Sequence, residues 1–203
     1  MTQDGILFIV SAPSGAGKTS LVRALLERVP GLSLSLSCTT RSPRPGETDG
    51  IHYRFLTQEH FRTAVAEGAF LEHAEVFGHL YGTREPDVRA CLAAGRDLIL
   101  EIDWQGARQV RQRLLGSVGI FILPPSMAEL ERRLRHRATD SDAVIARRLA
   151  QARDDMRHAA DYDYLVVNGD FGSALDALAA IVAAERLRAV RQVSRVSELL
   201  AGG

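Results

Sequence analysis

The sequence predicts an α/β fold in which a central parallel sheet is flanked by helices. Short apolar runs alternate with amphipathic helical patterns along the chain, as expected of β–α–β units. A glycine-rich segment directly follows the first apolar run, at a position where open parallel sheets bind ligands. The 203 residues, 46% hydrophobic and 25% charged, suit one substantial core. We therefore expect a single domain over residues 1–203.

The spacing of apolar residues gives the expected elements in order. Residues 6–10 form a continuous apolar run and predict the first strand. A helix over about 18–29 follows and ends at Pro30-Gly31. Three further strands are expected at 98–100, 120–123 and 164–167, followed by helices at 105–115, 126–137 and 172–197. Right-handed crossovers would bring the loops after these strands to one edge of the sheet.

The end of the chain carries apolar residues at helical spacing. Leu187, Val190, Val193 and Leu199 are spaced to share one helix face. We expect this face to pack against the core. Self-association is the alternative, and the sequence leaves the oligomeric state open.

Two regions interrupt the alternation of strands and helices. Residues 38–87 start with a loop at 39–50 that is rich in proline and glycine. A strand at 51–56, a helix with Thr57 as N-cap and a strand at 70–77 should follow, forming a small, partly antiparallel lobe. The arginine-dense segment 132–148 has the character of a helix–loop–helix.

The segment Ser11–Thr19 predicts a phosphate-binding loop between a strand and a helix. Such a loop turns successive backbone N–H groups toward a polyphosphate. Lys18 would reach the β- and γ-phosphates, and the Thr19 hydroxyl would bind Mg²⁺. The usual first glycine of the motif is replaced by Ala12. The alternative is a glycine-rich turn that only joins two elements. The residues expected to hold ATP here are Ala12, Pro13, Ser14, Gly15, Ala16, Gly17, Lys18, Thr19 and Ser20.

Arg41 and Arg44 lie in the proline-bounded loop. Two guanidinium groups in a restrained loop suit a phosphate dianion, because each offers a bidentate fork. Tyr53 and Tyr81 could add hydroxyl donors, although such tyrosines are often packing residues. A pair of solvated loop arginines is the alternative.

Glu101 and Asp103 end a buried strand and are expected to share one of its faces. Carboxylates beside a phosphate loop can hold Mg²⁺ directly or through water. The alternative is an acid in a turn at the strand end.

Six arginines gather between residues 132 and 148. Most of them are expected on solvated helix faces. The functional interpretation is a lid that brings arginines onto a transferring phosphoryl group.

Bulk composition narrows the function classes. The 25 basic and 25 acidic residues balance, so no overall field favours nucleic acid or membranes. Lys18 is the only lysine, which strengthens its phosphate role. No signal peptide or membrane-spanning run is recognisable, so a cytoplasmic location is expected. Cys38 and Cys91 are expected to be reduced, half-buried thiols, and the histidine spacing argues against a structural metal site.

Taken together, the motifs resemble the guanylate kinase family from about residue 5 to 190. The segment Thr39–Glu47 is the most specific part of the resemblance. The other matching segments are Ser11–Lys18, Phe70–Gly78, Tyr81–Thr83, Ile102–Gly106, Ile122–Ser126 and Tyr162–Asn168.

The resemblance implies the P-loop nucleoside monophosphate kinase fold. Its core would comprise 1–36 and 88–203, with a GMP-binding lobe at 37–87 and a lid at about 137–148. It also implies the substrates ATP and GMP, with dGMP as a further acceptor, and Mg²⁺ as cofactor.

Site residues carry over by position. Arg41, Arg44, Tyr53 and Tyr81 would hold the phosphate of GMP, and Ser37, Glu72, Thr83 and Asp103 would bind its guanine. Arg133, Arg137 and Arg148 match arginines that contact ATP phosphates, and Asn168 matches a residue near the adenine. Lys18, Arg41 and these three arginines are the expected catalytic residues. Glu101 stands where the family commonly has Asp, which leaves the Mg²⁺ coordination open.

Two other functions compete with GMP phosphorylation. Another P-loop phosphotransferase would lack the 39–47 segment or Glu72, and both are present. A non-catalytic scaffold module typically has a degraded phosphate loop, whereas Lys18 and Thr19 are intact here.

Overall fold

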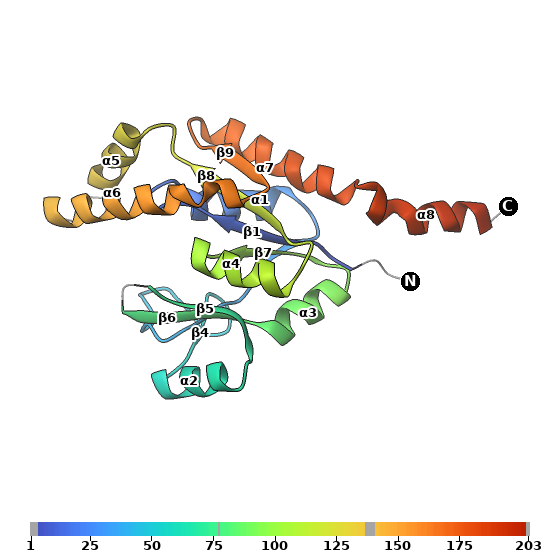
Figure 1. Cartoon of the computed structure of the whole chain (residues 1–203), viewed down its shortest axis with the longest axis horizontal. Helices are drawn as coiled ribbons and strands as arrows, with labels where there is room; N and C mark the ends of the chain where they lie inside the picture. Colours follow the sequence, from blue (N-terminus) through green and yellow to red (C-terminus); the bar gives the residue numbers. More distant parts are fainter. Residues whose placement is uncertain (1–3, 77, 137–140, 202–203) are drawn as a thin grey trace.

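The computed structural model describes residues 4–76, 78–136 and 141–201. At its centre lies a five-stranded sheet with the order β2-β7-β1-β8-β9 (Figure 1). Neighbouring strands all pair in parallel, which confirms the predicted fold class. The strands are β1 (Leu7–Ser11), β2 (Leu32–Leu34), β7 (Asp97–Glu101), β8 (Val118–Leu123) and β9 (Tyr164–Val167). The three-residue β2 escaped the prediction because so short a run has no recognisable period.

Two helical layers cover the sheet, and β1 shows how its residues are divided between them. Phe8 and Val10 pack into the cluster formed with α1 (Lys18–Arg28) and α7 (Phe171–Arg186). Leu7 and Ile9 pack on the opposite face, with α3 (Glu85–Ala93) and α4 (Trp104–Arg113). All four side chains are at most 4% exposed. The buried strand β1 therefore fixes where the following loop begins.

A second, four-stranded sheet has the order β4-β3-β6-β5. Its strands are β3 (Cys38–Thr39), β4 (Arg54–Phe55), β5 (Phe70–Val76) and β6 (His79–Arg84). Pairing is parallel between β3 and β4 and antiparallel elsewhere, so the mixed character is confirmed. The strand expected at 51–56 is shortened to β4, because the Gly50 N–H donates to the Tyr53 carbonyl and turns the chain there.

Helix α2 (Gln58–Ala66) covers this second sheet. The Thr57 hydroxyl accepts from the His60 N–H at 3.1 Å, which confirms Thr57 as the N-cap. Phe61 stacks on Phe70 with ring centroids 4.5 Å apart, beside the buried Cys38. This sheet thus has its own small hydrophobic core. We propose that residues 37–87 form a separate lobe and that residues 1–36 and 88–203 form the main body of the domain.

Helices α5 (Met127–His136) and α6 (Asp142–Arg157) form a pair with a cluster of its own, followed by the short 3₁₀ helix η1 (Ala159–Asp161). Figure 1 shows the pair at the end of the molecule opposite the C-terminus. The two helices of the expected helix–loop–helix are confirmed. Arg137 and the first part of the expected lid lie outside the described residues.

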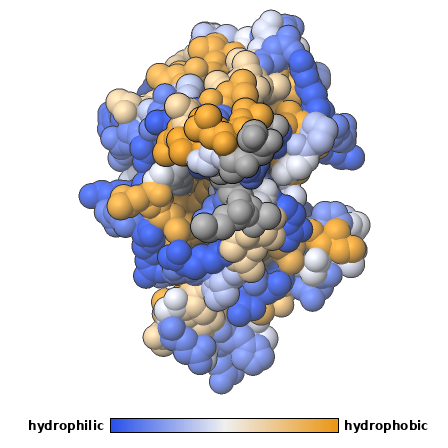
Figure 2. All heavy atoms as spheres, turned by 90° about the vertical axis from the view of Figure 1, so that its right-hand side faces the viewer, coloured by the Kyte–Doolittle hydropathy of each residue, from blue (hydrophilic) through white to orange (hydrophobic). Residues whose placement is uncertain are grey.

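The expected helix at 172–197 is two helices, α7 and α8 (Ala189–Ala201). Leu187, Val190, Val193 and Leu199 are 60–80% exposed, so the prediction that this face packs against the core is wrong. The chain turns after Arg186, and α8 extends beyond the sheet (Figure 1). Figure 2 views the molecule from the end that carries the C-terminus and shows apolar side chains gathered on that side. Helical spacing shows which residues share a face but not what covers it. None of the described helices has the length and apolar character needed to cross a bilayer.

Both cysteines are free thiols. Cys38 is 0% exposed and Cys91 is 8% exposed, so they are buried rather than half-buried as expected. Cys38 packs in the small core of the second sheet and Cys91 in the main core.

Candidate active site

The loop after β1 has the backbone that a phosphate site requires. Gly15 and Gly17 adopt positive φ angles of 92° and 91°. A Cβ atom at Gly17 would lie 2.4 Å from Asn168 Nδ2, and one at Gly15 would lie 2.9 Å from a Leu134 methyl carbon. Both positions therefore need glycine. Ala12 precedes this tight part of the loop, which explains why the missing first glycine of the motif leaves the loop intact.

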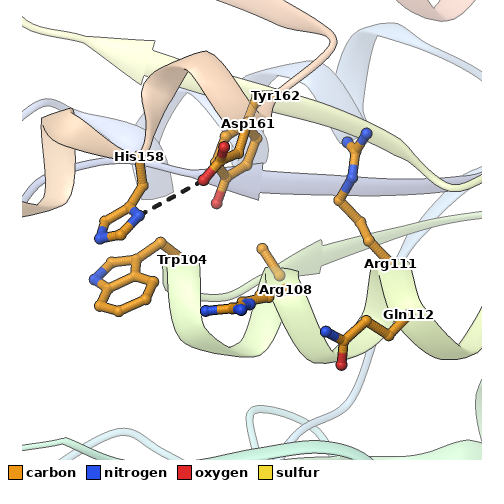
Figure 3. Close-up of a pocket in the computed structure, with 8 residues that line it drawn as sticks. Trp104, Arg108, Arg111, Gln112, His158, Asp161 and Tyr162 are labelled. Carbon is orange, nitrogen blue, oxygen red and sulfur yellow. Dashed lines mark ion pairs between the residues drawn. The ribbon is translucent and has the colours of Figure 1, made fainter.

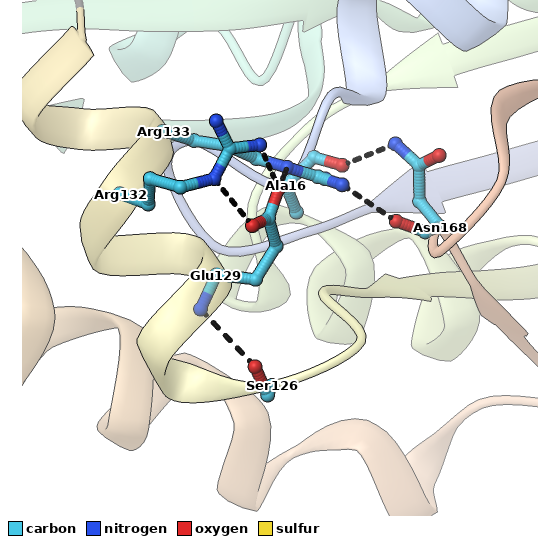
Figure 4. A network of polar contacts seen from close by, with 6 residues as sticks. All are labelled: Ala16, Ser126, Glu129, Arg132, Arg133 and Asn168. Atoms are coloured by element: carbon cyan, nitrogen blue, oxygen red, sulfur yellow. Dashed lines mark hydrogen bonds and ion pairs between the residues drawn. The ribbon is translucent and has the colours of Figure 1, made fainter.

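The loop is fastened from outside by Asn168, which is 5% exposed. The side-chain Nδ2 of Asn168 donates to the Ala16 carbonyl at 2.7 Å. The main-chain carbonyl of Asn168 accepts from Arg133 Nη2 at 3.0 Å (Figure 4). Arg133 Nε also donates to Glu129 at 2.8 Å. Arg133, expected on ATP phosphates, thus joins α5 to the residue that holds the loop.

The carboxyl end of β7 lies beside the start of α1. The Thr19 hydroxyl donates to Glu101 Oε1, and Lys18 Nζ donates to the Ile102 carbonyl at 3.3 Å. Burial lowers the pKa of Lys18, while the carboxylates of Glu101 and Asp103 raise it. The lysine is therefore held where loop and strand end meet.

Asp103 does not share a strand face with Glu101 as expected, because β7 ends at Glu101. It is the N-cap of α4, accepting from the Gly106 N–H at 2.9 Å. Within the described residues, no three His, Cys, Asp or Glu side chains form a metal cluster. The paired oxygens of Thr19 and Glu101 nevertheless fit Mg²⁺, which takes few protein oxygens and keeps several waters.

A cleft of about 580 Å³ opens over the loop. It is lined by three groups besides the loop: the start of α4, the β5–β6 hairpin and one face of α6. The α6 residues Arg147, Gln151 and Asp155 are four apart and so share a face. Gln151 and Asp155 are not among the residues predicted from the sequence, although this spacing could have indicated them. The half-buried Arg148, expected on ATP phosphates, is not among the lining residues.

A second group is buried between β5, β6 and α4. Glu72 is 4% exposed and accepts from the Thr83 hydroxyl at 2.6 Å. Burial raises the pKa of Glu72 to about 7, and the nearby Asp103 carboxylate adds to the effect. A Cβ atom at Gly106 would lie 2.7 Å from Glu72 Oε2. Glycine at this position keeps α4 close to the carboxylate.

The arginine loop is held by its own carboxylate. Arg41 Nη2 donates to Glu47 at 2.8 Å, and the Arg44 N–H donates to the other Glu47 oxygen at 2.7 Å. These bonds lower the pKa of Glu47 to about 2. The Arg41 guanidinium lies 5.5 Å from the Tyr53 ring centroid, so it is partnered, whereas Arg44 is exposed.

The remaining predicted residues lie in the second sheet or directly beside its strands. The rings of Tyr53 and Tyr81 meet edge to face at 6.2 Å. Glu101 helps to raise the pKa of Tyr53, although burial is the larger cause, so this group lies within electrostatic reach of the strand end. Ser37 lies just before β3, where its carbonyl accepts from the Arg54 N–H at 2.9 Å.

The parallel sheet, the glycine loop leading into α1 and the cleft over Lys18 and Thr19 define a P-loop nucleotide-binding protein. The comparisons with known proteins refine this class. The family model described as guanylate kinase matches residues 5–185. The chain is 56% identical to a guanylate kinase of Alkalilimnicola ehrlichii over 196 residues, covering 97% of both chains. It is 54% identical to a guanylate kinase of Escherichia coli over 203 residues, covering 97% of this chain and 98% of the relative.

A solved structure agrees with these sequence relatives. The crystal structure of guanylate kinase from Anaplasma phagocytophilum matches with a TM-score of 0.78 and 35% identity, over 98% of this chain and 95% of that one. The chain belongs to the guanylate kinase family and is an enzyme of that family, a nucleotide kinase. The resemblance seen in its motifs is confirmed.

Proposed function

We propose that this chain transfers the γ-phosphoryl group of ATP directly and in line to GMP, forming ADP and GDP with Mg²⁺. The observation that carries the choice of acceptor is the buried Glu72–Thr83 pair beside Asp103. Guanine presents donors at N1 and at its 2-amino group, which a carboxylate complements. Adenine presents an acceptor at N1, so it would leave this buried carboxylate unpaired, and such losses discriminate strongly.

The donor side is the loop from Ala12 to Ser20. Its backbone N–H groups and Lys18 would bind the phosphates of ATP, and Asn168 would lie near the adenine. Arg133, Arg137 and Arg148 would supply further positive charge. The contact of Arg133 with the Asn168 carbonyl supports a role close to the loop, since both side chains bear on its position.

On the acceptor side, Arg41, Arg44, Tyr53 and Tyr81 would hold the phosphate of GMP, and Ser37 would help to bind its base. The second pKa of a phosphate monoester is about 6, so at neutral pH most of the acceptor is already a dianion. No general base is then required. Catalysis would consist of positioning and of stabilising charge on the transferring group.

Thr19 and Glu101 would hold Mg²⁺, with Asp103 acting directly or through water. The ion would supply charge neutralisation at the β- and γ-phosphate oxygens. The hydroxyl–carboxylate contact between Thr19 and Glu101 supports this pair, since it brings the two oxygens together beside the phosphate loop.

The test is a coupled assay of ADP formation with GMP, dGMP, AMP, UMP and dTMP as acceptors. We expect GMP and dGMP to be phosphorylated at least about a hundredfold better than the others, as expected when a buried polar group selects the base. Preference for another acceptor would support the rival phosphotransferase. Absence of ATP-dependent GDP formation would support the scaffold function. We place the reaction in the cytoplasm, in the synthesis and recycling of guanine nucleotides.

A further inference from the structure

An aromatic stack lies directly beside the cleft. Trp104, the first residue of α4, stacks on His158, the C-cap of α6, with ring centroids 3.7 Å apart and planes 11° apart (Figure 3). The neighbours of Trp104 in the sequence, Asp103 and Gln105, both line the cleft. The stack therefore joins the last turn of α6 to the first turn of α4.

The stack continues the face of α6 that lines the cleft. Arg147, Gln151 and Asp155 lie on that face, and His158 follows three residues after Asp155. Asp155 is also close enough to Lys18 to raise its pKa. Any tilt of α6 at His158 would therefore move charged side chains relative to the floor of the cleft.

At its other end, α6 is held by apolar packing on α5. Leu130 and Leu134 of α5 form a separate cluster with Ile145 and Ala152 of α6. Leu134 also lies against Gly15 of the phosphate loop. This cluster holds α6 from its first turn to its third, and the stack with Trp104 supports its last turn.

The His158 imidazole also lies near two carboxylates: it counteracts the burial that raises the pKa of Asp155, and it faces Asp161. Its Nδ1 lies 3.6 Å from Asp161 Oδ2, and the Asp161 side chain is 75% exposed. Exposed ion pairs contribute little to holding a geometry. The indole–imidazole contact is therefore the stronger candidate for fixing α6, and the two contributions can be separated by substitution.

We propose that Trp104 and His158 are positioning residues that hold α6 over the cleft, so that its charged face meets the transferring phosphoryl group. The inference deepens the proposed function and rests on it. Neither Trp104 nor His158 is among the residues that line the cleft. Loss of the stack should therefore slow the chemical step more than it weakens the binding of GMP.

The kinetic test compares His158→Ala with His158→Phe, which retains a stacking ring. We expect His158→Ala to lower kcat about tenfold with less than about a threefold change in the KM for GMP, because misplacement costs rate before binding. His158→Phe should keep most of the wild-type kcat. Two control variants should match the wild type. Asp161→Asn removes the ion pair with His158, and His60→Ala removes an exposed histidine of α2. A wild-type kcat in His158→Ala, or equal losses in the Ala and Phe variants, would overturn the proposal.

A spectroscopic measurement tests the stack without substrate. Trp104 is the only tryptophan, so fluorescence excited at the red edge of the indole band, where tyrosine does not absorb, reports on this ring alone. We expect the emission of His158→Ala to shift to longer wavelength as water reaches the indole, and unchanged emission would overturn the stack. This readout separates the two hypotheses. If the wild-type protein has no GMP kinase activity, the proposed function is wrong. The emission shift still shows whether the two rings are stacked.

Discussion

The phosphate loop and the arginine loop, the proposed donor and acceptor sides of the site, are stabilised in different ways. The phosphate loop is held by residues far away in the sequence: Asn168 binds the Ala16 carbonyl, and Ala16 itself is 0% exposed in the main core. The acceptor loop is held from within, because Arg41 pairs with Glu47 only six residues away. Long-range contacts in a packed core fix a geometry before any ligand binds. Local contacts within one loop can be exchanged for ligand contacts, so under the proposed function the Arg41 guanidinium would leave Glu47 for a phosphate.

The largest expected effect lies on the donor side. Lys18→Ala should lower kcat/KM about a thousandfold, or about 4 kcal/mol in transition-state stabilisation, as loss of a preorganised charge does. Steady-state kinetics with varied ATP and GMP measure it. The unfolding midpoint should stay close to that of the wild type. A loss below about tenfold would mean that the loop binds phosphate without this lysine and would weaken the contrast between the two sides.

The second effect concerns the buried part of the acceptor side. The folded pKa of Glu72, about 7, exceeds its ordinary value of 4.5, so the folded state retains a proton that the unfolded state has lost between these values. The free energy of unfolding should therefore fall as pH rises from about 4.5 to about 7, by on the order of 3 kcal/mol at most, and then level off.

Urea denaturation of the wild type and Glu72→Gln at pH 5 and pH 8 tests this dependence. The amide cannot ionise, so the variant should lose this part of the pH dependence. Glu59→Gln, on the exposed surface of α2, is the matched control and should behave like the wild type. If Glu72→Gln keeps the full slope, another group is responsible and Glu72 is ionised throughout.

Arg41→Ala should lower kcat/KM for GMP about a hundredfold, with a higher KM and a lower kcat. The KM for ATP should hardly change, because the contacts of Arg41 are with Glu47, Tyr53 and Tyr81 rather than with the phosphate loop. Arg62→Ala on α2 serves as the matched control. Unchanged GMP kinetics would remove Arg41 from the phosphate site and leave its pairing with Glu47 as a purely structural contact.

The smallest effect tests how the loop is fastened. Asn168→Ala leaves the Ala16 carbonyl without its donor, which should cost about 1–2 kcal/mol of stability. We expect a few-fold rise in the KM for ATP and no change in the KM for GMP. Chemical denaturation and initial-rate kinetics give both quantities, with Gln58→Ala as a surface amide control. A selective rise in the KM for GMP would contradict the view that the two sides are supported independently.

The parts of the site that could be predicted are those formed by residues adjacent to one another in the sequence. The phosphate loop requires glycines next to a lysine and a threonine, so a single short segment carries the signal. Thr57 as an N-cap is equally local and is confirmed. The parallel sheet could be predicted because its strands are buried on both faces. Such strands appear in the sequence as continuous apolar runs that alternate with helices.

The errors arose where tertiary packing decides. Asp103 lies only two residues after Glu101, but the strand ends between them and the helix takes Asp103 as its cap. Asp155 reaches the cleft only because α6 packs against α5 and the stack. The apolar face of α8 has the same period as that of a buried helix, but α8 extends beyond the end of the sheet (Figure 1).

The single lysine of the chain has a practical consequence for chemical labelling. Amine-directed acylating reagents find one side chain to modify, at the floor of the cleft. Burial lowers the pKa of Lys18 and so increases the neutral, nucleophilic fraction of its amine. A nucleotide lying on the loop would cover that amine. The rate of covalent labelling at this position is therefore a direct measure of how much of the donor site is occupied.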